Sequence, residues 1–152
     1  GDPPLDSPIG IAVLPNGDYV VADSGAAVLR RISPSGAMST FAGVEGQKGM
    51  IDATSELTRF DRPIAVAVDA AGNVYVSDQG ANHRIRRVRA DGVVETLAGD
   101  GERGFADGDG ASARFYGQEG IALSPDGTLL YVADGNDGDD SGYHRIRVIH
   151  LP

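Results

Sequence analysis

The chain has 152 residues, of which 41% are hydrophobic, and its 13 Lys and Arg against 22 Asp and Glu give a formal net charge of −9. This acidic balance argues against a nucleic-acid partner, because binding to phosphates depends on clustered Lys and Arg. The sequence contains no cysteine, which excludes disulfides and cysteine metal sites and leaves the compartment open. No apolar run reaches the roughly 18 residues that cross a bilayer, so no membrane span is expected.

One block of sequence recurs three times at a spacing of 55 residues. Its opening apolar run occupies residues 10–13, 65–68 and 120–123. A second apolar run, which ends in aspartate each time, occupies residues 19–23, 74–78 and 130–134. A fixed period of this length indicates one supersecondary unit used repeatedly, with each unit burying an apolar face on its neighbour.

The middle block shows the composition of one unit most clearly. Its pattern predicts strands over residues 64–68, 74–77, 83–89 and 93–98. The first of these is a short apolar run that suits a strand buried on both faces. Turns over 70–73 and 90–92 separate the strands, and the Asn16-Gly17 and Asp126-Gly127 pairs of the other blocks are strong hairpin signals. Four antiparallel strands joined by tight turns are typical of a propeller blade.

A longer connection leads from each block to the next. The segments 52–60 and 107–115 lie in these connections, and we expect each to contain a helical turn. Leu5, Phe60 and Phe115 recur just before the first strand of each block. A large apolar side chain at an equivalent position of every unit is predicted to pack between blades.

Arginines gather in the third strand of each block. They are predicted to lie on the strand surface and to pair with the many aspartates. In this strand Ile85 and Val88 are three residues apart, as are Leu29 and Ile32, so the alternation expected of a strand is broken. The spacing predicts either a β-bulge or an arginine that faces a half-exposed groove.

The residues of the middle block resemble a known repeat. The run 74–78 followed by Asn82-His83-Arg84-Ile85 is similar to the core of the NHL repeat, named after its Asn-His-Leu motif. The segment 97–115 resembles the connection in many bacterial and plant NHL proteins. The first block departs from the motif with Ala26-Ala27-Val28-Leu29, and the third has Tyr143-His144 after an insertion. These departures put in doubt any role of the histidine in every blade.

The resemblance implies a β-propeller, usually six-bladed, that serves as a rigid platform for protein, peptide, glycan or RNA ligands. Related propellers include metal-dependent lactonases and a peptide-amidating lyase, and fold alone does not choose among these activities. We predict a non-enzymatic protein-interaction scaffold. The alternatives are a metal-dependent hydrolase or lyase of related shape, and an RNA-binding NHL domain, which the acidic charge disfavours.

The loops after the second strands are the predicted binding face. Its candidate residues are Asp23, Asp78, Gln79, Asn82, His83, Asp134 and His144. For the three aspartates there is an alternative role, in which each carboxylate accepts hydrogen bonds from the turn that follows. No catalytic residue is expected, because the first strands carry Ile, Ala, Val and Leu, with only Asp69 and Glu119 acidic near their ends.

The insertion of the third block contains the one cofactor candidate. Asp137, Asp139 and Ser141 match the opening of a calcium loop, with oxygen ligands at alternate positions. Val148 stands where such a loop carries a bidentate glutamate, so the motif is incomplete. An acidic solvated loop is therefore the favoured interpretation, with Ca²⁺ as the alternative.

The third block lacks a predicted fourth strand. The blades are expected at about 8–43, 63–99 and 118–152, as an incomplete or half six-bladed β-propeller of about eleven strands. Since propellers have at least four blades, three cannot close a ring, and both ends are predicted to expose apolar surface. A longer chain, a second copy or another protein partner would complete the propeller.

Overall fold

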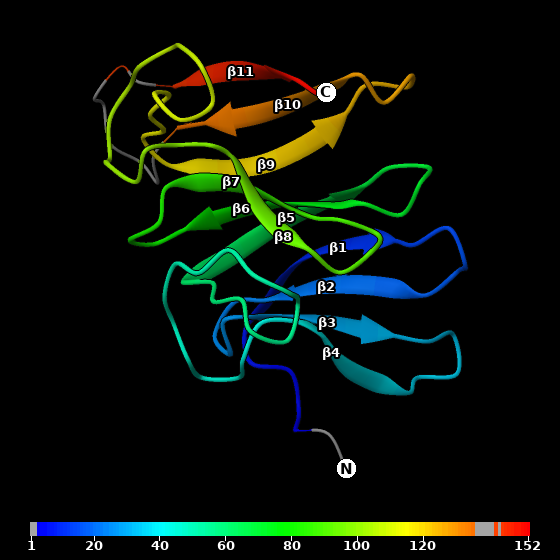
Figure 1. Cartoon of the computed structure of the whole chain (residues 1–152). Coiled ribbons are helices and arrows are strands. Elements are labelled where there is room, and N and C mark those ends of the chain that lie inside the picture. The colour runs from blue at the N-terminus through cyan, green and yellow to red at the C-terminus, as the bar shows by residue number, and fades with distance from the viewer. Residues whose placement is uncertain (1–2, 136–141, 143) are drawn as a thin grey trace.

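The protein is built from β-strands alone in the residues that its structure describes. This computed structural model describes residues 3–135, 142 and 144–152 (Figure 1). The strands are β1 (Pro8–Val13), β2 (Tyr19–Asp23), β3 (Val28–Ile32), β4 (Met38–Ala42), β5 (Arg62–Val68), β6 (Val74–Gln79), β7 (Arg84–Val88), β8 (Val94–Ala98), β9 (Gln118–Leu123), β10 (Leu129–Asp134) and β11 (Arg145–His150). The all-β prediction is confirmed.

The strands form three antiparallel sheets that stack as successive blades (Figure 1). Two sheets have four strands, in the orders β1-β2-β3-β4 and β5-β6-β7-β8, and the third has three, in the order β11-β10-β9. Within each sheet, each strand pairs with the next one along the chain, which is the arrangement of propeller blades. The three sheets do not close into a ring.

The first strands of the blades lie side by side, since β1 contacts β5 and β5 contacts β9. The backbones of β1 and β5 approach each other so closely that a Cβ on Gly10 would lie 2.6 Å from the carbonyl oxygen of Ile64. Only glycine fits at such a distance. The close approach places the first strands at the inner side of the blade stack.

Two apolar cores join the three blades. The first core combines Val20 and Leu29 of the first blade with Val74 and Val76 of the second. The other core combines side chains of the second and third blades, and its members include Tyr75, Ile85, Leu130 and Val132. Phe60 lies in the first core and Phe115 in the second, both fully buried, so the prediction that these rings pack between blades is confirmed.

The connections between blades contain turns and isolated bridges. Each of the segments 52–60 and 107–115 contains one turn closed by a helical hydrogen bond between residues four apart. In the first the amide of Thr58 donates to the carbonyl oxygen of Thr54, and in the second the amide of Ala113 donates to that of Asp109, both at 2.9 Å. The predicted helical turns are therefore confirmed, as single turns that do not continue into a helix.

The third strands contain the predicted bulge. The pairing of β7 with β8 shifts register between Ile85 and Arg86, and that of β3 with β4 shifts at the equivalent position. The prediction that the strand arginines lie on the surface was wrong for Arg30, Arg86 and Arg147, all of which are buried. The bulge breaks the alternation of side chains, and Arg86 reaches the carbonyl oxygens of Ile51 and Arg59 in the preceding connection.

The outward faces of the first and third blades carry exposed apolar side chains. Ile11 on β1 is 64% exposed, whereas Val66, its equivalent on β5, is 8% exposed because the first blade covers it. At the other end Ile146 is 70% exposed, whereas the equivalent Ile85 is fully buried. Both ends therefore expose apolar surface, as predicted.

Candidate functional site

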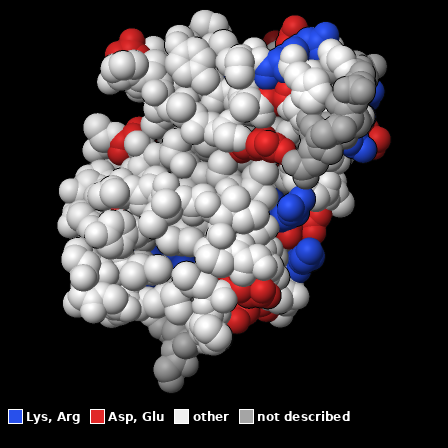
Figure 2. All heavy atoms as spheres, turned by 180° about the vertical axis from the view of Figure 1, so that it is seen from behind, with Lys and Arg blue, Asp and Glu red and all other residues white. Residues whose placement is uncertain are grey.

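The loops that follow β2 and β6 reach the same end of the blade stack as the two connections, and β10 ends there as well (Figure 1). Seen from behind, the surface carries few charged side chains except along this edge, where both signs gather (Figure 2). The candidate residues of the predicted binding face belong to this edge or lie beneath it.

The three aspartates of the predicted face are buried. Each ends the second strand of its blade and pairs with the arginine of the third strand. The pairs are Asp23 with Arg30 at 3.2 Å, Asp78 with Arg86 at 3.2 Å, and Asp134 with Arg147 at 2.9 Å. All three carboxylates are thus shielded from solvent and balanced by a guanidinium within the fold.

The other oxygen of each carboxylate holds the chain that enters the first strand. Oδ1 of Asp78 accepts hydrogen bonds from the backbone amides of Asp61 and Arg62, at 3.1 and 3.0 Å. Asp134 accepts from Tyr116 and Gly117 in the same way. Each aspartate thus ties three segments of its blade together, which explains why it recurs at the same place.

Asp78 lies in a buried polar network with Asn82 and Arg86. Burial raises the pKa of Asp78 to about 6, while the hydrogen bond from Asn82 and the charge of Arg86 act in the opposite direction. The guanidinium of Arg86 also lies over the ring of Phe60, 4.6 Å from its centroid. At neutral pH the carboxylate is ionised and balances the buried guanidinium.

Asn82 of the motif belongs to this network as well. It is buried, and its amide donates to the carbonyl oxygen of Gly49 at 2.8 Å and to Asp78 at 2.7 Å. The asparagine therefore links the loop after β6 to the preceding connection.

Gln79 and His83 line one pocket between the second and third blades. The pocket has a volume of about 260 Å³, and its other lining residues are Arg62, Gly80, Arg103, Tyr116 and Gly117. His83 is half-buried with a φ of 44°, in the left-handed region that few side chains adopt. Burial and the nearby charge of Arg103 lower the pKa of His83, which keeps the imidazole neutral at pH 7.

The guanidinium groups of this pocket have defined positions. Arg103 lies over the ring of Tyr116, 4.2 Å from its centroid, and donates to the carbonyl oxygen of the same residue. Arg62 donates to Oε1 of Gln79 at 2.8 Å. Two cations around a small opening favour a ligand with a carboxylate or another anionic group.

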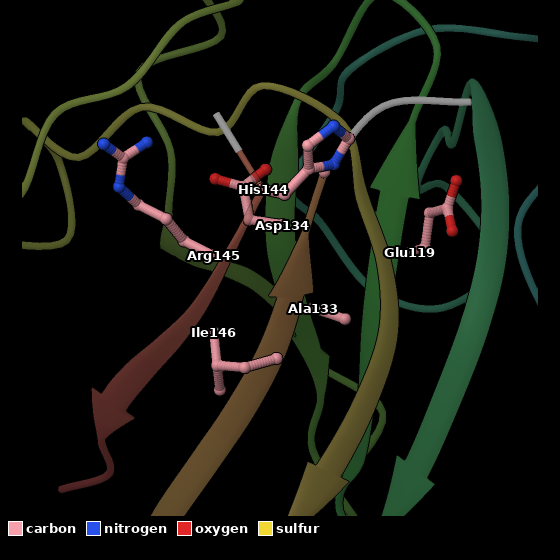
Figure 3. A pocket seen from close by; sticks show the side chains of 7 residues that line it. Glu119, Ala133, Asp134, His144, Arg145 and Ile146 are labelled. Atoms are coloured by element: carbon pink, nitrogen blue, oxygen red, sulfur yellow. The ribbon is translucent and has the colours of Figure 1, made fainter. Parts of the chain in front are cut away.

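His144 lines a second pocket on the outward face of the third blade. This pocket has a volume of about 420 Å³ and is lined by Glu119, Ala133, Asp134, Gly135, His144, Arg145 and Ile146. Asp134, His144 and Arg145 lie toward one end of it, and Ile146 lies farther along β11 (Figure 3). Arg145 lies over the ring of Phe105 at 3.9 Å. The pocket combines an exposed imidazole with an apolar floor.

The structure therefore divides the candidates into three groups. It brings Gln79 and His83 together around one pocket and places His144 at another. It buries Asp23, Asp78, Asn82 and Asp134, and of these Asp134 also lines the pocket of His144. Sequence reasoning missed Arg62, Arg103 and Tyr116. Arg103 stands in the glycine-rich connection after β8, and no periodic pattern there indicates that it turns toward the loop after β6.

The calcium candidates Asp137, Asp139 and Ser141 lie outside the described residues. Among the residues that are described, no group of three or more His, Asp or Glu side chains is placed to hold a metal ion. Nor does that part of the chain contain a helix long and apolar enough to cross a membrane.

Stacked antiparallel blades, two of four strands and one of three, with adjacent inner strands define a β-propeller segment. Comparison with family models specifies the blades further, since residues 5–27 and 60–88 match the NHL repeat. Segments of the first and second blades thus match the repeat that the sequence motif predicts. Among curated proteins, none matches this chain.

Several solved structures share the fold. A protein of unknown function from Bacteroides thetaiotaomicron has a TM-score of 0.78 and 24% identity, over 88% of this chain and 32% of its own. An auxiliary nutrient binding protein from the same organism has a TM-score of 0.70 and 24% identity, over 82% of this chain and 34% of its own. Virginiamycin B lyase from Staphylococcus aureus has a TM-score of 0.53 and 18% identity, over 95% of this chain and 41% of its own. The chain spans about a third of the length of the first two, and these likenesses concern the fold alone.

Proposed function

We propose that this chain is a non-enzymatic protein-interaction scaffold that works as part of a larger propeller or assembly. The observation that carries the proposal is the contrast between equivalent positions of the repeat. Ile85 is fully buried between two blades, while Ile146 is 70% exposed on the outward face of the third blade. In the second blade a neighbouring blade covers the apolar face that contains Ile85. The equivalent face of the third blade is exposed, and such a face is suited to contact with another protein surface.

The pocket at the seam between the second and third blades supports the same function. The pocket that holds Gln79 and His83 offers two arginines and a tyrosine to a ligand at the seam between blades. Loops positioned by a rigid framework are common binding elements. One of the structural neighbours is described as an auxiliary nutrient binding protein, which is in keeping with a binding role for such a propeller.

The test alters the two end faces. Ile11→Glu and Ile146→Glu place a charge on each exposed face, and we expect the double variant to bind less of an apolar dye and to associate less in sedimentation velocity than the unaltered chain. Val93→Glu is the matched control, because this exposed apolar residue lies away from both end faces. A wild-type chain that stays monomeric, binds no dye and melts cooperatively would contradict the proposal.

The alternative is a metal-dependent hydrolase or lyase of related shape, and one of the structural neighbours is a virginiamycin B lyase. This alternative predicts that the purified chain holds a divalent ion and turns over a lactone, whereas the scaffold predicts neither. Metal analysis together with a lactone hydrolysis assay separates the two functions. The RNA-binding alternative predicts affinity for RNA that falls steeply with salt, and binding assays from low to high salt test it.

A further inference from the structure

The two seams between blades are built from equivalent parts. The first seam joins the first and second blades, and the second seam joins the second and third. Lys48 and Arg103 each precede a glycine whose amide donates to the carbonyl oxygen of the buried ring residue, Phe60 or Phe115, at 3.0 Å in both seams. The lysine and the arginine therefore occupy equivalent positions. Both seams lie between blades that the chain itself contains.

In the first seam the cation is paired with a carboxylate of the chain. Nζ of Lys48 lies 3.7 Å from Oδ1 of Asp61. Oδ2 of the same carboxylate accepts a hydrogen bond from the amide of Ala81 in the loop after β6. The first seam thus balances its own positive charge.

In the second seam a tyrosine takes the place of this aspartate. The amides of Asp61 and Tyr116 donate to equivalent carboxylates, those of Asp78 and Asp134, at 3.1 and 2.9 Å. Arg103 contacts the ring and the carbonyl oxygen of the tyrosine. Within the described part of the chain it forms no ion pair, so its charge lacks the partner that the first seam provides.

A second cation is added at the same seam. Arg62 stands opposite Gln79 at the start of its blade, where the first blade has Ser7 opposite Ser24. The guanidinium of Arg62 donates to Oε1 of Gln79 at 2.8 Å and, among the described residues, pairs with no carboxylate. The second seam therefore has one cation more and one carboxylate fewer than the first.

The nearest acidic side chains do not balance these two arginines. The charges of Asp61 and Asp134 act on His83 beside the pocket. Each is already paired, however, Asp61 with Lys48 at 3.7 Å and Asp134 with Arg147 at 2.9 Å. The pocket is thus left with a local excess of positive charge in a chain whose net charge is −9.

An imidazole is the third polar group that the second seam adds. Ala27 and His83 each stand directly before the third strand of their blade, with φ of 56° and 44°. The loop conformation is therefore common to both blades, and only the side chain differs. A neutral imidazole has one N–H donor and brings no further charge to the pocket.

We propose that the pocket at the second seam binds a carboxylate group, carried by a small organic acid or by the C-terminus of a partner chain. Planar guanidinium groups match the two oxygens of a carboxylate, and Arg103 is held in place by the ring of Tyr116. The volume of about 260 Å³ suits a small group. The bound carboxylate supplies the charge that Asp61 supplies in the first seam. The inference rests on the proposed binding role and names the ligand chemistry of one site.

The test follows amide resonances of the full ¹⁵N-labelled chain by NMR. The probes are acetate, the peptide acetyl-Ala-Ala-Ala with a free carboxylate, and the same peptide as its C-terminal amide. Titrations are run at low salt, because both arginines are exposed and salt screens them. We expect saturable shifts at Gly80, Arg103 and Gly117, and binding of the amide peptide that is about tenfold or more weaker, because the charged group is lost.

The two carboxylate probes distinguish the source of the ligand. Acetate that binds as tightly as the peptide acid identifies a small acid as sufficient. A peptide acid that binds much more tightly than acetate identifies the C-terminus of a partner chain. Inorganic phosphate is the comparison anion, and phosphate that binds while neither carboxylate does would overturn the proposal.

Variants of the two arginines test the assignment of the site. Arg62→Gln and Arg103→Gln are each expected to weaken binding of the carboxylate probe that binds best by about fivefold or more, because a hydrogen bond from a charged donor is lost. Arg89→Gln is the matched control, an exposed arginine that pairs with Asp91 in the turn before β8. Thermal melting verifies that the variants are folded. Equal effects of all three variants would overturn the assignment to this pocket.

A further variant introduces into the second seam the carboxylate of the first. Tyr116→Asp places an aspartate beside Arg103, as Asp61 lies beside Lys48, and we expect it to abolish carboxylate binding. Tyr19→Asp is the control, because it changes the net charge equally at an exposed tyrosine of β2. Carboxylate binding that survives Tyr116→Asp in a folded chain would contradict the proposal.

The remaining outcomes separate this inference from the scaffold function. If no carboxylate binds, or the peptide acid and its amide bind equally, while the end faces still associate through Ile11 and Ile146, the pocket assignment is wrong and the scaffold function stands. If carboxylate binds at the pocket while the chain shows no association, the site stands and the scaffold function fails.

Discussion

Arg86 and Asp78 form an ion pair of 3.2 Å in which both side chains are fully shielded from solvent. The pair sits where the second strand, the third strand and the chain entering the blade converge. Removal of one partner leaves the other charge buried, which is much more costly than the loss of an exposed pair.

We therefore expect Arg86→Met to lower the free energy of unfolding by about 3–5 kcal/mol. The matched control is Arg89→Met, whose pair with Asp91 is about half exposed and is worth about 0–1 kcal/mol. Urea denaturation followed by circular dichroism measures both. Equal midpoints for the two variants would show that the buried pair does not stabilise the blade.

The close approach of β1 and β5 makes a second prediction. Gly10→Ala places a Cβ 2.6 Å from the carbonyl oxygen of Ile64, so we expect a loss of about 1–3 kcal/mol as the two strands separate. Gly120 occupies the equivalent position of the third blade and has open space around its Cα. Gly120→Ala is expected to leave the melting temperature unchanged or slightly raised. Thermal melts of the two variants measure the difference, and a Gly10→Ala chain as stable as the wild type would refute the packing argument.

The blade architecture could be predicted because local signals repeat. Turn dipeptides such as Asn16-Gly17 and alternating apolar residues depend on near neighbours in the sequence, and three copies reinforce one another. The burial of Arg86 could not be predicted in this way, because a bulge breaks the alternation and its partner Asp52 is 34 residues away. Whether two charged residues so far apart in the sequence meet depends on the path that the connection takes, and the sequence pattern does not indicate this path.

The residues of the candidate site likewise differ in how far the sequence could predict them. Gln79 and His83 could be assigned to one loop from the motif alone, and the structure places both in a single pocket. Arg103 and Tyr116 reach that pocket from the connection between the second and third blades, whose course has no period to indicate it. The pair of Arg147 with Asp107 was likewise hidden, because 40 residues separate the two in the sequence.

Phe60 makes a third prediction, about the seam between blades. Its ring is fully buried in the core shared by the first and second blades and lies under the guanidinium of Arg86. Phe60→Ala is expected to cost about 3–5 kcal/mol, since it removes both the packing and the contact with the cation. Leu57→Ala, at an exposed position of the same connection, should change stability by about 0.5 kcal/mol or less. Guanidinium unfolding measures both, and a small effect at Phe60 would mean that the blades are not joined through this ring.

Asp69 makes a prediction about pH. Partial burial alone would raise its pKa, but hydrogen bonds from Asn73, Tyr75 and the amide of Ala71 lower the pKa overall from its ordinary 3.8. A carboxyl group with a lowered pKa in the folded protein stabilises the fold above its unfolded pKa, and that stability is lost as the pH falls through the folded pKa.

We expect Asp69→Ala to lower the free energy of unfolding by about 1 kcal/mol at pH 7, and the difference from wild type to shrink as the pH falls below 3.8. Asp69→Asn is the control, because it keeps an acceptor in the turn but does not titrate, so its stability should lack this pH dependence. Denaturation curves at pH 3, 5 and 7 measure the three proteins. A difference between wild type and Asp69→Ala that stays constant over this range would show that the Asp69 carboxylate does not contribute through its charge.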